Sequence, residues 1–259
     1  MATTALITGA TGLIGGHVVR HWDIRGLEPV FLDRRSEDLL TPGVPTALVR
    51  RLRPAVVVHL AWTASGTPGY RTSPDNDRWV EASLELERAC QDAGAWLVAT
   101  GTVLDSTGDS PDAYSAAKVR LRHALTPAIA AQTVTWLRPY YVVDPEMRRP
   151  ALIADALAAR DAGVTLGLRT PESRHDFIHA SDVGRAVVVT VRHRLHGVVP
   201  IGSGRLRTVR DLVAALGVPW IPTADAPTAI SQHHEAADST RLRDLGWSPK
   251  LTEQLFGGR

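Results

Sequence analysis

The chain has 259 residues, of which 44% are apolar and 22% are charged, a composition that is typical of a folded globular protein and excludes a disordered chain. Its 29 basic side chains are interspersed among 27 acidic ones without a long basic run, which argues against nucleic-acid binding. No apolar run approaches the ~20 residues that span a bilayer, no leader pattern precedes the first strand, and the single cysteine fits a reducing compartment, so we expect a cytoplasmic protein.

The first predicted element is a short apolar strand at residues 5–7, followed by a glycine-rich turn at 8–15 and a helix over 16–22. Three glycines at intervals of three let the backbone turn sharply, let a pyrophosphate approach, and let the helix pack close to the strand. A helix N-terminus also favours an anion. A glycine turn that serves packing alone is the alternative, but the strand–turn–helix order favours dinucleotide binding.

The second predicted strand, residues 28–33, ends in Asp33, which lies 24 positions beyond Gly9. A carboxylate at this place can accept hydrogen bonds from an adenosine ribose, which favours NAD. The neighbouring Arg34 and Arg35 can instead hold a 2′-phosphate, so NADP is the alternative cofactor.

Strands and helices then alternate along the chain. Pro54 ends a helix, residues 55–61 form a continuous apolar run typical of a strand buried on both faces, and 62–76 read as a loop at the ligand-binding edge. The next predicted elements are a helix at 77–93, a strand at 95–99, a helix from 112 to about 131 and a strand at 133–137. This alternation predicts an α/β fold with a doubly wound parallel sheet, Rossmann-like in its topology.

Beyond residue 137 the pattern is less regular. We expect a proline-bearing loop at 138–150, helices at 151–160, 181–192 and 208–216, short strands at 164–166 and 198–201, and no assignable element at 219–238. The domains we predict are a dinucleotide-binding Rossmann domain at 1–147, to which 177–202 return, and a smaller substrate lobe at 148–176 and 203–259.

Tyr114 and Lys118 are four residues apart on a predicted helix and therefore share one face. There the ammonium group is expected to lower the pKa of the phenol, so that the tyrosine exchanges a proton with a substrate oxygen near neutral pH. The alternative is an ordinary surface pair. Thr100, at the end of the preceding strand, is the candidate for a hydroxyl that orients the reacting oxygen, with Thr102 in reserve. The histidines lack the spacing of zinc ligands, so no metal is expected.

Several motifs occur in a familiar order along nearly the whole chain. They are residues 8–15, Asp33, residues 59–61, Thr100, the Tyr114/Lys118 pair, Arg138-Pro139, and residues 175–183, 201–204 and 239–249. As a set they resemble the extended short-chain dehydrogenase/reductases, the NAD-dependent epimerase/dehydratase family. The resemblance implies a nucleotide-activated sugar as substrate, Tyr114 as acid/base, Lys118 on the nicotinamide ribose, and a homodimer formed through the helices at 77–93 and 112–131.

The resemblance and the predicted loops together give the candidate site. For the cofactor the residues are Gly9, Thr11, Gly12, Leu13, Ile14, Gly15, Asp33, Arg34, Asp38, Leu39, Leu60, Ala61, Trp62, Tyr114, Lys118 and Tyr140; for the substrate they are Thr63, Thr102, Tyr141, Arg174 and His175.

The chain also departs from the pattern of the family. Residues 103–105 read Val-Leu-Asp where Val-Tyr-Gly is frequent, Trp79 takes the place of an asparagine, and His175 that of an arginine that holds phosphate, with Arg174, Arg169 and Arg205 as candidates for that task. The uncharged Gly101 and Thr102 argue against dehydration and decarboxylation, because elimination needs a further acid and base.

Two redox reactions therefore remain. Residues 70–79 are similar to a loop of nucleotide 4-ketohexose reductases, which favours reduction of a keto group, at C4 of a deoxysugar, over epimerisation through a transient ketone. A small ketone without a nucleotide is a further alternative substrate, and a non-catalytic NAD(P) sensor is the alternative class, against which the retained Tyr114 and Lys118 argue.

Overall fold

The computed structural model describes residues 3–32, 37–63, 67–106, 112–224 and 235–257. The chain forms two compact units, one of residues 1–138 and 184–199 and the other of residues 139–183 and 200–259. Each unit has its own hydrophobic core: the first is built around Leu6, Leu97 and Trp136, and the second around Ile153 and Leu212.

The first unit is organised by a six-stranded sheet with the order β10-β5-β4-β3-β1-β2. The strands are β1 (Thr3–Thr8), β2 (Leu27–Phe31), β3 (Val56–His59), β4 (Trp96–Thr100), β5 (Val134–Pro139) and β10 (Gly197–Ile201). From β2 through β1, β3 and β4 to β5, neighbouring strands pair in parallel. The predicted Rossmann-like doubly wound α/β fold is therefore confirmed.

The position of each strand follows from its side chains. All four residues of β3 are buried, as the continuous Val-Val-Val run predicts for a central strand of a parallel sheet. β2 is the edge strand, carries Pro29 and leaves Phe31 exposed, in keeping with the confinement of proline to sheet edges. The carboxyl ends of β1, β3 and β4 accordingly meet at one edge of the sheet.

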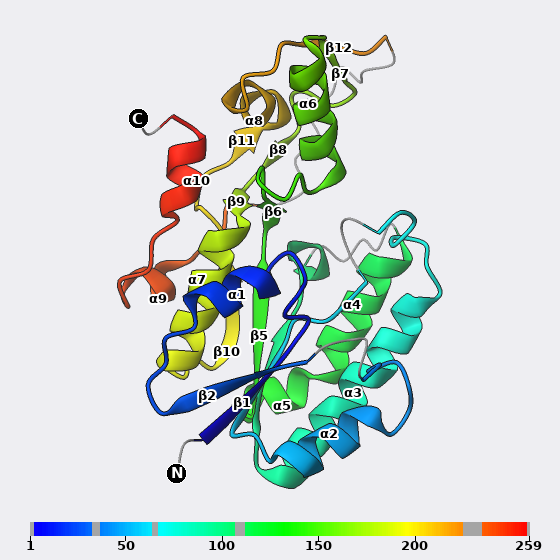
Figure 1. The fold of residues 1–259 in the computed structure, drawn as a ribbon, viewed down its shortest axis with the longest axis vertical. Coiled ribbons are helices and arrows are strands. Elements are labelled where there is room, and N and C mark those ends of the chain that lie inside the picture. Colours follow the sequence, from blue (N-terminus) through cyan, green and yellow to red (C-terminus); the bar gives the residue numbers. More distant parts are fainter. Residues whose placement is uncertain (1–2, 33–36, 64–66, 107–111, 225–234, 258–259) are drawn as a thin grey trace. The chain divides into compact units, whose positions relative to one another are not determined.

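The described helices of the first unit are α1 (Gly15–His21), α2 (Val44–Leu52), α3 (Asp75–Ala93), α4 (Ala113–Ala124), α5 (Thr126–Ala130) and most of α7 (Ala180–Arg192), as labelled in Figure 1. Gly94 ends α3 in the left-handed conformation, as predicted. The single helix predicted from 112 to about 131 was wrong, because the chain divides it at Leu125. Pro127 explains the break, since it has no N–H and its ring excludes the carbonyl four residues earlier.

The described residues of the second unit form three two-stranded sheets. β6 (Tyr141–Val143) pairs with β9 (Phe177–His179), β7 (Leu166–Leu168) with β12 (Trp220–Pro222), and β8 (Arg174–His175) with β11 (Arg207–Thr208). Its helices are α6 (Ala151–Ala162), α8 (Val209–Ala215), α9 (Thr240–Arg243) and α10 (Lys250–Leu255). The expectation of a loop throughout 138–150 was wrong, because β6 lies inside it. This strand exists through its pairing with a distant segment and leaves little local pattern.

Two buried carboxylates hold this second unit together. Asp176 accepts hydrogen bonds from the backbone N–H groups of Ser203, Gly204 and Ala237 and from the Ser203 hydroxyl, at 2.6–2.9 Å. Asp182 accepts from the N–H and hydroxyl of Thr252, both at 2.7 Å. The motif at 175–183 thus fastens the C-terminal segments of the chain.

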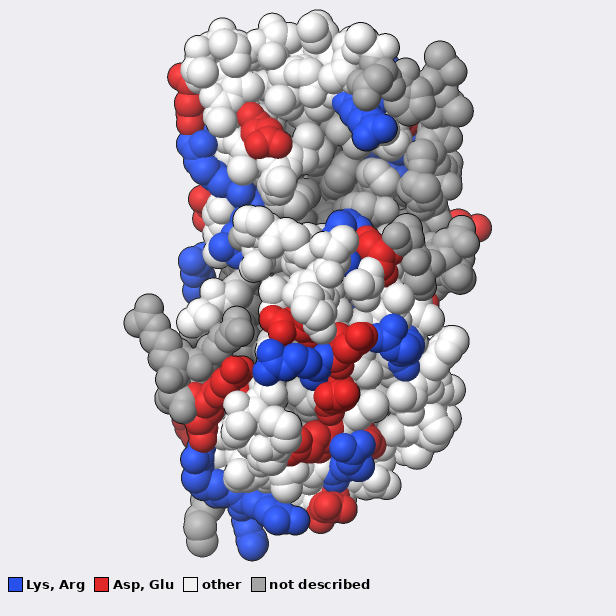
Figure 2. Space-filling view, turned by 90° about the vertical axis from the view of Figure 1, so that its right-hand side faces the viewer, with Lys and Arg blue, Asp and Glu red and all other residues white. Residues whose placement is uncertain are grey.

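None of the helices in the described part of the chain combines the length and hydrophobicity of a transmembrane segment. On the face shown in Figure 2, acidic and basic side chains are interspersed. Ion pairs join charged side chains of two helices of the first unit, among them Arg78 with Asp75 on α3 and Arg120 of α4 with Asp77 of α3.

Candidate active site

The glycine bend between β1 and α1 lies against the end of β3. Gly9 has φ +70°, and a Cβ there would lie 2.6 Å from the backbone nitrogen of Ala61. A Cβ on Gly15 would lie 2.0 Å from the carbonyl oxygen of Gly9. Only glycine therefore allows this bend, on which Thr11, Leu13 and Ile14 also lie. No side chain of the described residues caps the first turn of α1, where the N–H groups of Gly16 and His17 donate to the backbone carbonyls of Gly12 and Ile14.

A chain of buried hydrogen bonds fixes the strand ends beside this bend. The Ala61 N–H donates to the Thr8 hydroxyl, which lies 2.8 Å from Nδ1 of His59, and Nε2 of His59 lies 3.0 Å from the Ser83 hydroxyl. Because that hydroxyl donates to the carbonyl of Trp79, it is assigned as the acceptor from Nε2–H, which places a proton on Nε2. Burial, together with the charge of Lys118, lowers the pKa of His59 to about 3.

The adenine side of the predicted site is only partly described. Asp33 and Arg34 lie outside the described residues. Asp38 accepts a hydrogen bond from the backbone of Leu40, and Leu39 is buried in the core of the first unit.

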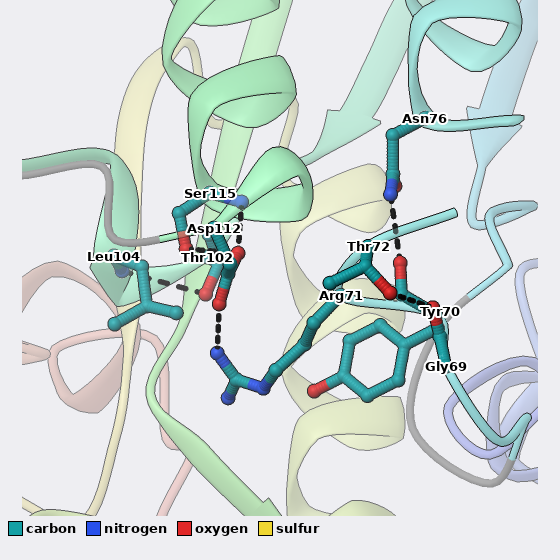
Figure 3. A network of polar contacts seen from close by, with 9 residues as sticks. All are labelled: Gly69, Tyr70, Arg71, Thr72, Asn76, Thr102, Leu104, Asp112 and Ser115. Atoms are coloured by element: carbon teal, nitrogen blue, oxygen red, sulfur yellow. Dashed lines mark hydrogen bonds and ion pairs between the residues drawn. The ribbon is translucent and has the colours of Figure 1, made fainter. Parts of the chain in front are cut away.

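The first turn of α4 is held by the loop that follows β3 (Figure 3). Asp112 caps the helix by accepting from the N–H and hydroxyl of Ser115, and it also pairs with Arg71. The carbonyl of Arg71 in turn accepts from the N–H of Tyr114, and that of Tyr70 accepts from the side chain of Asn76. Tyr114 is thereby anchored at both the helix cap and the loop.

Tyr114 lies among aromatic side chains and bonds to Thr102. The rings of Tyr70 and Trp62 stand edge-on to it, with centroids 5.3 and 6.4 Å away. Desolvation raises the pKa of Tyr114 above its usual value, and the nearby Tyr70 phenol and the negative charge of Asp105 add to this rise. The Thr102 hydrogen bond and the positive charge of Arg71 oppose it. The expectation that the pKa of Tyr114 is lowered was wrong, because desolvation of the phenol dominates.

Lys118 is buried one helical turn further along. Its ammonium donates a 2.8 Å hydrogen bond to the carbonyl of Thr100 and lies 3.5 Å from the ring centroid of Trp62, but 6.0 Å from that of Tyr114. Desolvation lowers the pKa of Lys118 to about 7, against the opposing field of Asp105. The amine therefore titrates near neutral pH.

The two threonines at the end of β4 differ in their contacts. Thr102 bonds to Tyr114, whereas Oγ1 of Thr100 is buried and has no hydrogen-bond partner in the described part of the chain. A buried hydroxyl without a partner is costly, so the Thr100 side chain suits a ligand oxygen. Both threonines thus keep the places that the sequence suggests.

Aromatic side chains form a wall next to Tyr114 and Lys118. Trp62 and Trp79 stack at 6.0 Å, and their indole N–H groups donate to Asn76 and to Thr63, respectively. The role of the buried Asn76 was missed, and its only sequence signal was its place at the end of a polar loop.

Asp105 is a second residue that sequence reasoning left without a role. Its carboxylate is fully buried and accepts from the Nε1–H of Trp136 at 2.8 Å, from the Thr102 N–H at 3.1 Å and from Arg138 at 2.8 Å. The signal that could have found it was the aspartate in the position of a frequent family glycine.

The remaining candidates, Tyr140, Tyr141, Arg174 and His175, belong to the second unit. Tyr141 of β6 and His175 of β8 come from different two-stranded sheets, and their ring centroids lie 3.9 Å apart. Arg174 is exposed and pairs in register with Thr208. The backbone N–H of Tyr140 donates to the carbonyl of Ile201. Among the described residues no cluster of histidine, cysteine and carboxylate side chains is suited to a metal ion.

These features define a class: a Rossmann-like α/β protein with a glycine bend for a dinucleotide and a Tyr/Lys pair on the helix after the fourth strand. More particularly, the chain belongs to the NAD dependent epimerase/dehydratase family, whose sequence model matches residues 5–202. NAD is the cofactor of that family, and the bend at Gly9 and the partnerless Thr100 hydroxyl fit a bound dinucleotide and its substrate.

Solved structures share the fold over nearly the whole chain. UDP-glucose 4-epimerase of Thermus thermophilus, in complex with NAD, has a TM-score of 0.75 and 23% identity, covering 96% of this chain and 94% of its own. GDP-mannoheptose C4 reductase of Campylobacter jejuni, with NADP bound, has a TM-score of 0.74 and 15% identity, covering 95% of this chain and 93% of its own. dTDP-4-dehydrorhamnose reductase of Bacillus anthracis, in complex with NADP, has a TM-score of 0.75 and 14% identity, covering 98% of this chain and 96% of its own. The search of curated proteins found no match.

Proposed function

We propose that the chain is an NAD(P)-dependent oxidoreductase that reduces a keto group, at C4, of a nucleotide-activated deoxysugar. The observation that carries the proposal is the group of Tyr114, Thr102, Thr100 and Lys118 at the carboxyl end of β4. Desolvation of the phenol raises its pKa, so Tyr114 enters the reaction protonated at neutral pH. A protonated phenol is the acid that reduction of a ketone requires.

Each residue then has a defined task. When bound, the reduced nicotinamide supplies the hydride that converts the keto carbon to an alcohol carbon. Tyr114 donates its proton to the carbonyl oxygen, with Thr100 and Thr102 as the hydroxyls that hold that oxygen in place. Lys118, one helical turn away, is assigned to the nicotinamide ribose, as the resemblance to the family implies, and solvent returns a proton to Tyr114.

The cofactor contacts are proposed for the residues around the glycine bend and the end of β3, with Asp38 and Leu39 toward the adenine and Trp62 and Tyr140 toward the nicotinamide. Asp33 favours NAD and Arg34 leaves NADP as the alternative. The substrate contacts are proposed for Thr63, Tyr141, His175 and Arg174. The last three residues belong to the second unit, which is the proposed substrate lobe.

A nucleotide sugar is the proposed substrate because the printed names of similar structures include a GDP-mannoheptose C4 reductase and a dTDP-4-dehydrorhamnose reductase. We further propose a cytoplasmic homodimer that associates through α3 and α4. Epimerisation is the second candidate reaction, because UDP-glucose 4-epimerases of Thermus thermophilus and Thermotoga maritima are similar at 23% and 22% identity.

One experiment separates these reactions. The purified protein is mixed with NADH or NADPH and a panel of keto-sugar nucleotides, and nicotinamide absorbance is followed. A reductase consumes the coenzyme in step with the keto sugar. An epimerase interconverts 4-hydroxy sugars with no net change in absorbance, which would overturn reduction as the reaction.

Tyr114→Phe tests the proton donor itself. It removes the acid and keeps the ring, so we expect kcat to fall by about 10²–10⁴-fold while coenzyme affinity and melting temperature hold. Tyr70→Phe is the matched control, because it removes the neighbouring phenol and is expected to cost less than about tenfold. Coenzyme binding without turnover that depends on Tyr114, over the full panel, would favour a non-catalytic sensor.

A further inference from the structure

Asp105 lies in the short 3₁₀ helix at Val103–Ser106, directly after the strand end that carries Thr100 and Thr102. Its carboxylate is buried and makes contacts on both oxygens, one with Arg138 and the other with Trp136 and the Thr102 backbone. No step of the proposed reaction uses this group. A buried carboxylate beside a reaction centre calls for a physical reason, because burying a charge is costly unless it is compensated.

The first part of the reason is the shape of the turn. The Asp105 carboxylate accepts from the Thr102 N–H while the Asp105 N–H donates to the Thr102 carbonyl, so both ends of the turn are closed. Gly101 makes room for it: a Cβ at this position would lie 2.5 Å from the carboxylate and 2.3 Å from the Trp136 ring. Asp105 therefore holds the backbone of Thr102 on both sides, while the Thr102 hydroxyl accepts from the Leu104 N–H at 3.4 Å.

The second part is charge. The ionisable groups whose fields couple with Asp105 are Arg138 on β5 and Arg122, Lys118 and Tyr114 on α4. Arg138 is the direct counter-ion and is itself only 19% exposed. The negative charge of Asp105 favours the protonated forms of Lys118 and Tyr114 alike. The Asp105 carboxylate thus acts on Lys118 and Tyr114, whose pKa values are shifted chiefly by desolvation.

We propose that Asp105 is a positioning residue, which holds the Thr100–Gly101–Thr102 turn and, with Arg138 as its counter-ion, sets the charge on Lys118. The proposal rests on the proposed function in assigning Lys118 and Tyr114 to the reaction. The contacts of Asp105 and its effect on the charge of Lys118 do not depend on which substrate is reduced. The glycine that the family frequently has at this position cannot serve in this way.

The chain offers a direct way to measure the effect, because it contains only two lysines, Lys118 and Lys250. Protein labelled with ¹³C at lysine Cε gives two NMR signals, and Lys250→Arg assigns them, since Lys250 is exposed. In the wild type we expect the Lys118 signal to titrate near pH 7. This measurement needs no turnover, so its failure is distinct from a failure of the proposed reaction.

Two variants then make opposite predictions. Asp105→Asn removes the negative charge and should move the Lys118 titration to lower pH by about one pH unit. Arg138→Gln leaves the carboxylate without its counter-ion and should move the titration upward. Asp77→Asn, which removes an exposed carboxylate on α3, is the matched control and should leave it in place. Where substrate turnover is found, the pH midpoint of kcat should follow the NMR titration in each variant.

Shifts of the two variants in the same direction, or no shift in folded protein, would overturn the proposal. Removing one partner of a buried ion pair can unfold a protein, so the double variant Asp105→Asn/Arg138→Gln, which replaces the ion pair by amides, is made in parallel. It should titrate closer to the wild type than either single variant does. Loss of the folded state in all three variants would assign Asp105 a purely structural role and also overturn the proposal.

Discussion

The two units of the molecule bury carboxylates in different ways. In the second unit, Asp176 accepts from three backbone N–H groups and one hydroxyl. In the first unit, Asp105 faces Arg138 and lies within the field of Lys118 and Tyr114. The donors of Asp176 cannot change charge near neutral pH, whereas Lys118 can. The difference teaches that one buried carboxylate can hold backbone segments together, whereas another can shift the pKa of an ionisable neighbour.

The largest effect we expect in a test of this comparison comes from Asp176→Asn. The amide can still accept on one side, but its NH₂ group faces N–H donors of Gly204 and Ala237. Leaving such buried donors unpaired should lower the free energy of unfolding of the second unit by about 3 kcal/mol. Urea denaturation measures this loss, and hydrogen exchange should show faster exchange at the amides of Ser203, Gly204 and Ala237.

The matched control for this change is Asp155→Asn on α6, where the side chain is exposed and the charge change is the same. It should alter stability by less than about 0.5 kcal/mol. Coenzyme binding by the first unit should survive in Asp176→Asn below the unfolding transition. Equal stability of the two variants would contradict the structural role given to Asp176.

The fold of the first unit could be predicted because its signals are local. A Val-Val-Val run, glycine stops such as Gly94 and the Asp112 cap each mark one element within a few residues. The second unit could not be predicted as well, because β6 and β12 have three residues each and exist through pairing with distant segments. Short strands of this kind have no periodicity to read in the sequence.

The candidate site shows the same limit. Spacing alone puts Tyr114 and Lys118 on one face of α4, and the structure has both there. The spacing does not reveal that Lys118 donates to the Thr100 carbonyl and lies over Trp62, or that the aromatic surroundings raise the pKa of Tyr114. Those properties depend on side chains that are brought together only by the tertiary fold.

A second prediction concerns pH and His59, which is buried in the first unit and whose pKa is lowered to about 3. Below pH 6.5 His59 becomes protonated in the unfolded chain but stays neutral in the folded protein. The free energy of unfolding therefore decreases as the pH falls from 6.5 toward 3. At pH 5 the loss amounts to about 2 kcal/mol. His59→Gln should remove this part of the pH dependence, as measured by urea denaturation at pH 7 and pH 5.

The tautomer provides an independent check of the same prediction. Long-range ¹H–¹⁵N NMR should find the His59 ring neutral, with its proton on Nε2, in folded protein at pH 5. A ring that is protonated at pH 6 would contradict the assignment. The first unit would then have one buried ionisable group fewer whose pKa is shifted by burial, although Lys118 would remain.

The smallest effect is expected at the surface of the first unit, where Arg120 of α4 pairs with Asp77 of α3. Their side chains are 52% and 74% exposed, so water and salt screen the attraction. A double-mutant cycle with Arg120→Gln and Asp77→Asn should give a coupling below about 1 kcal/mol that vanishes in 1 M salt. A coupling that persists at high salt would show that the exposed pair behaves like the buried Asp105–Arg138 pair. Burial would then no longer explain why only some of the carboxylates in this protein act on their neighbours.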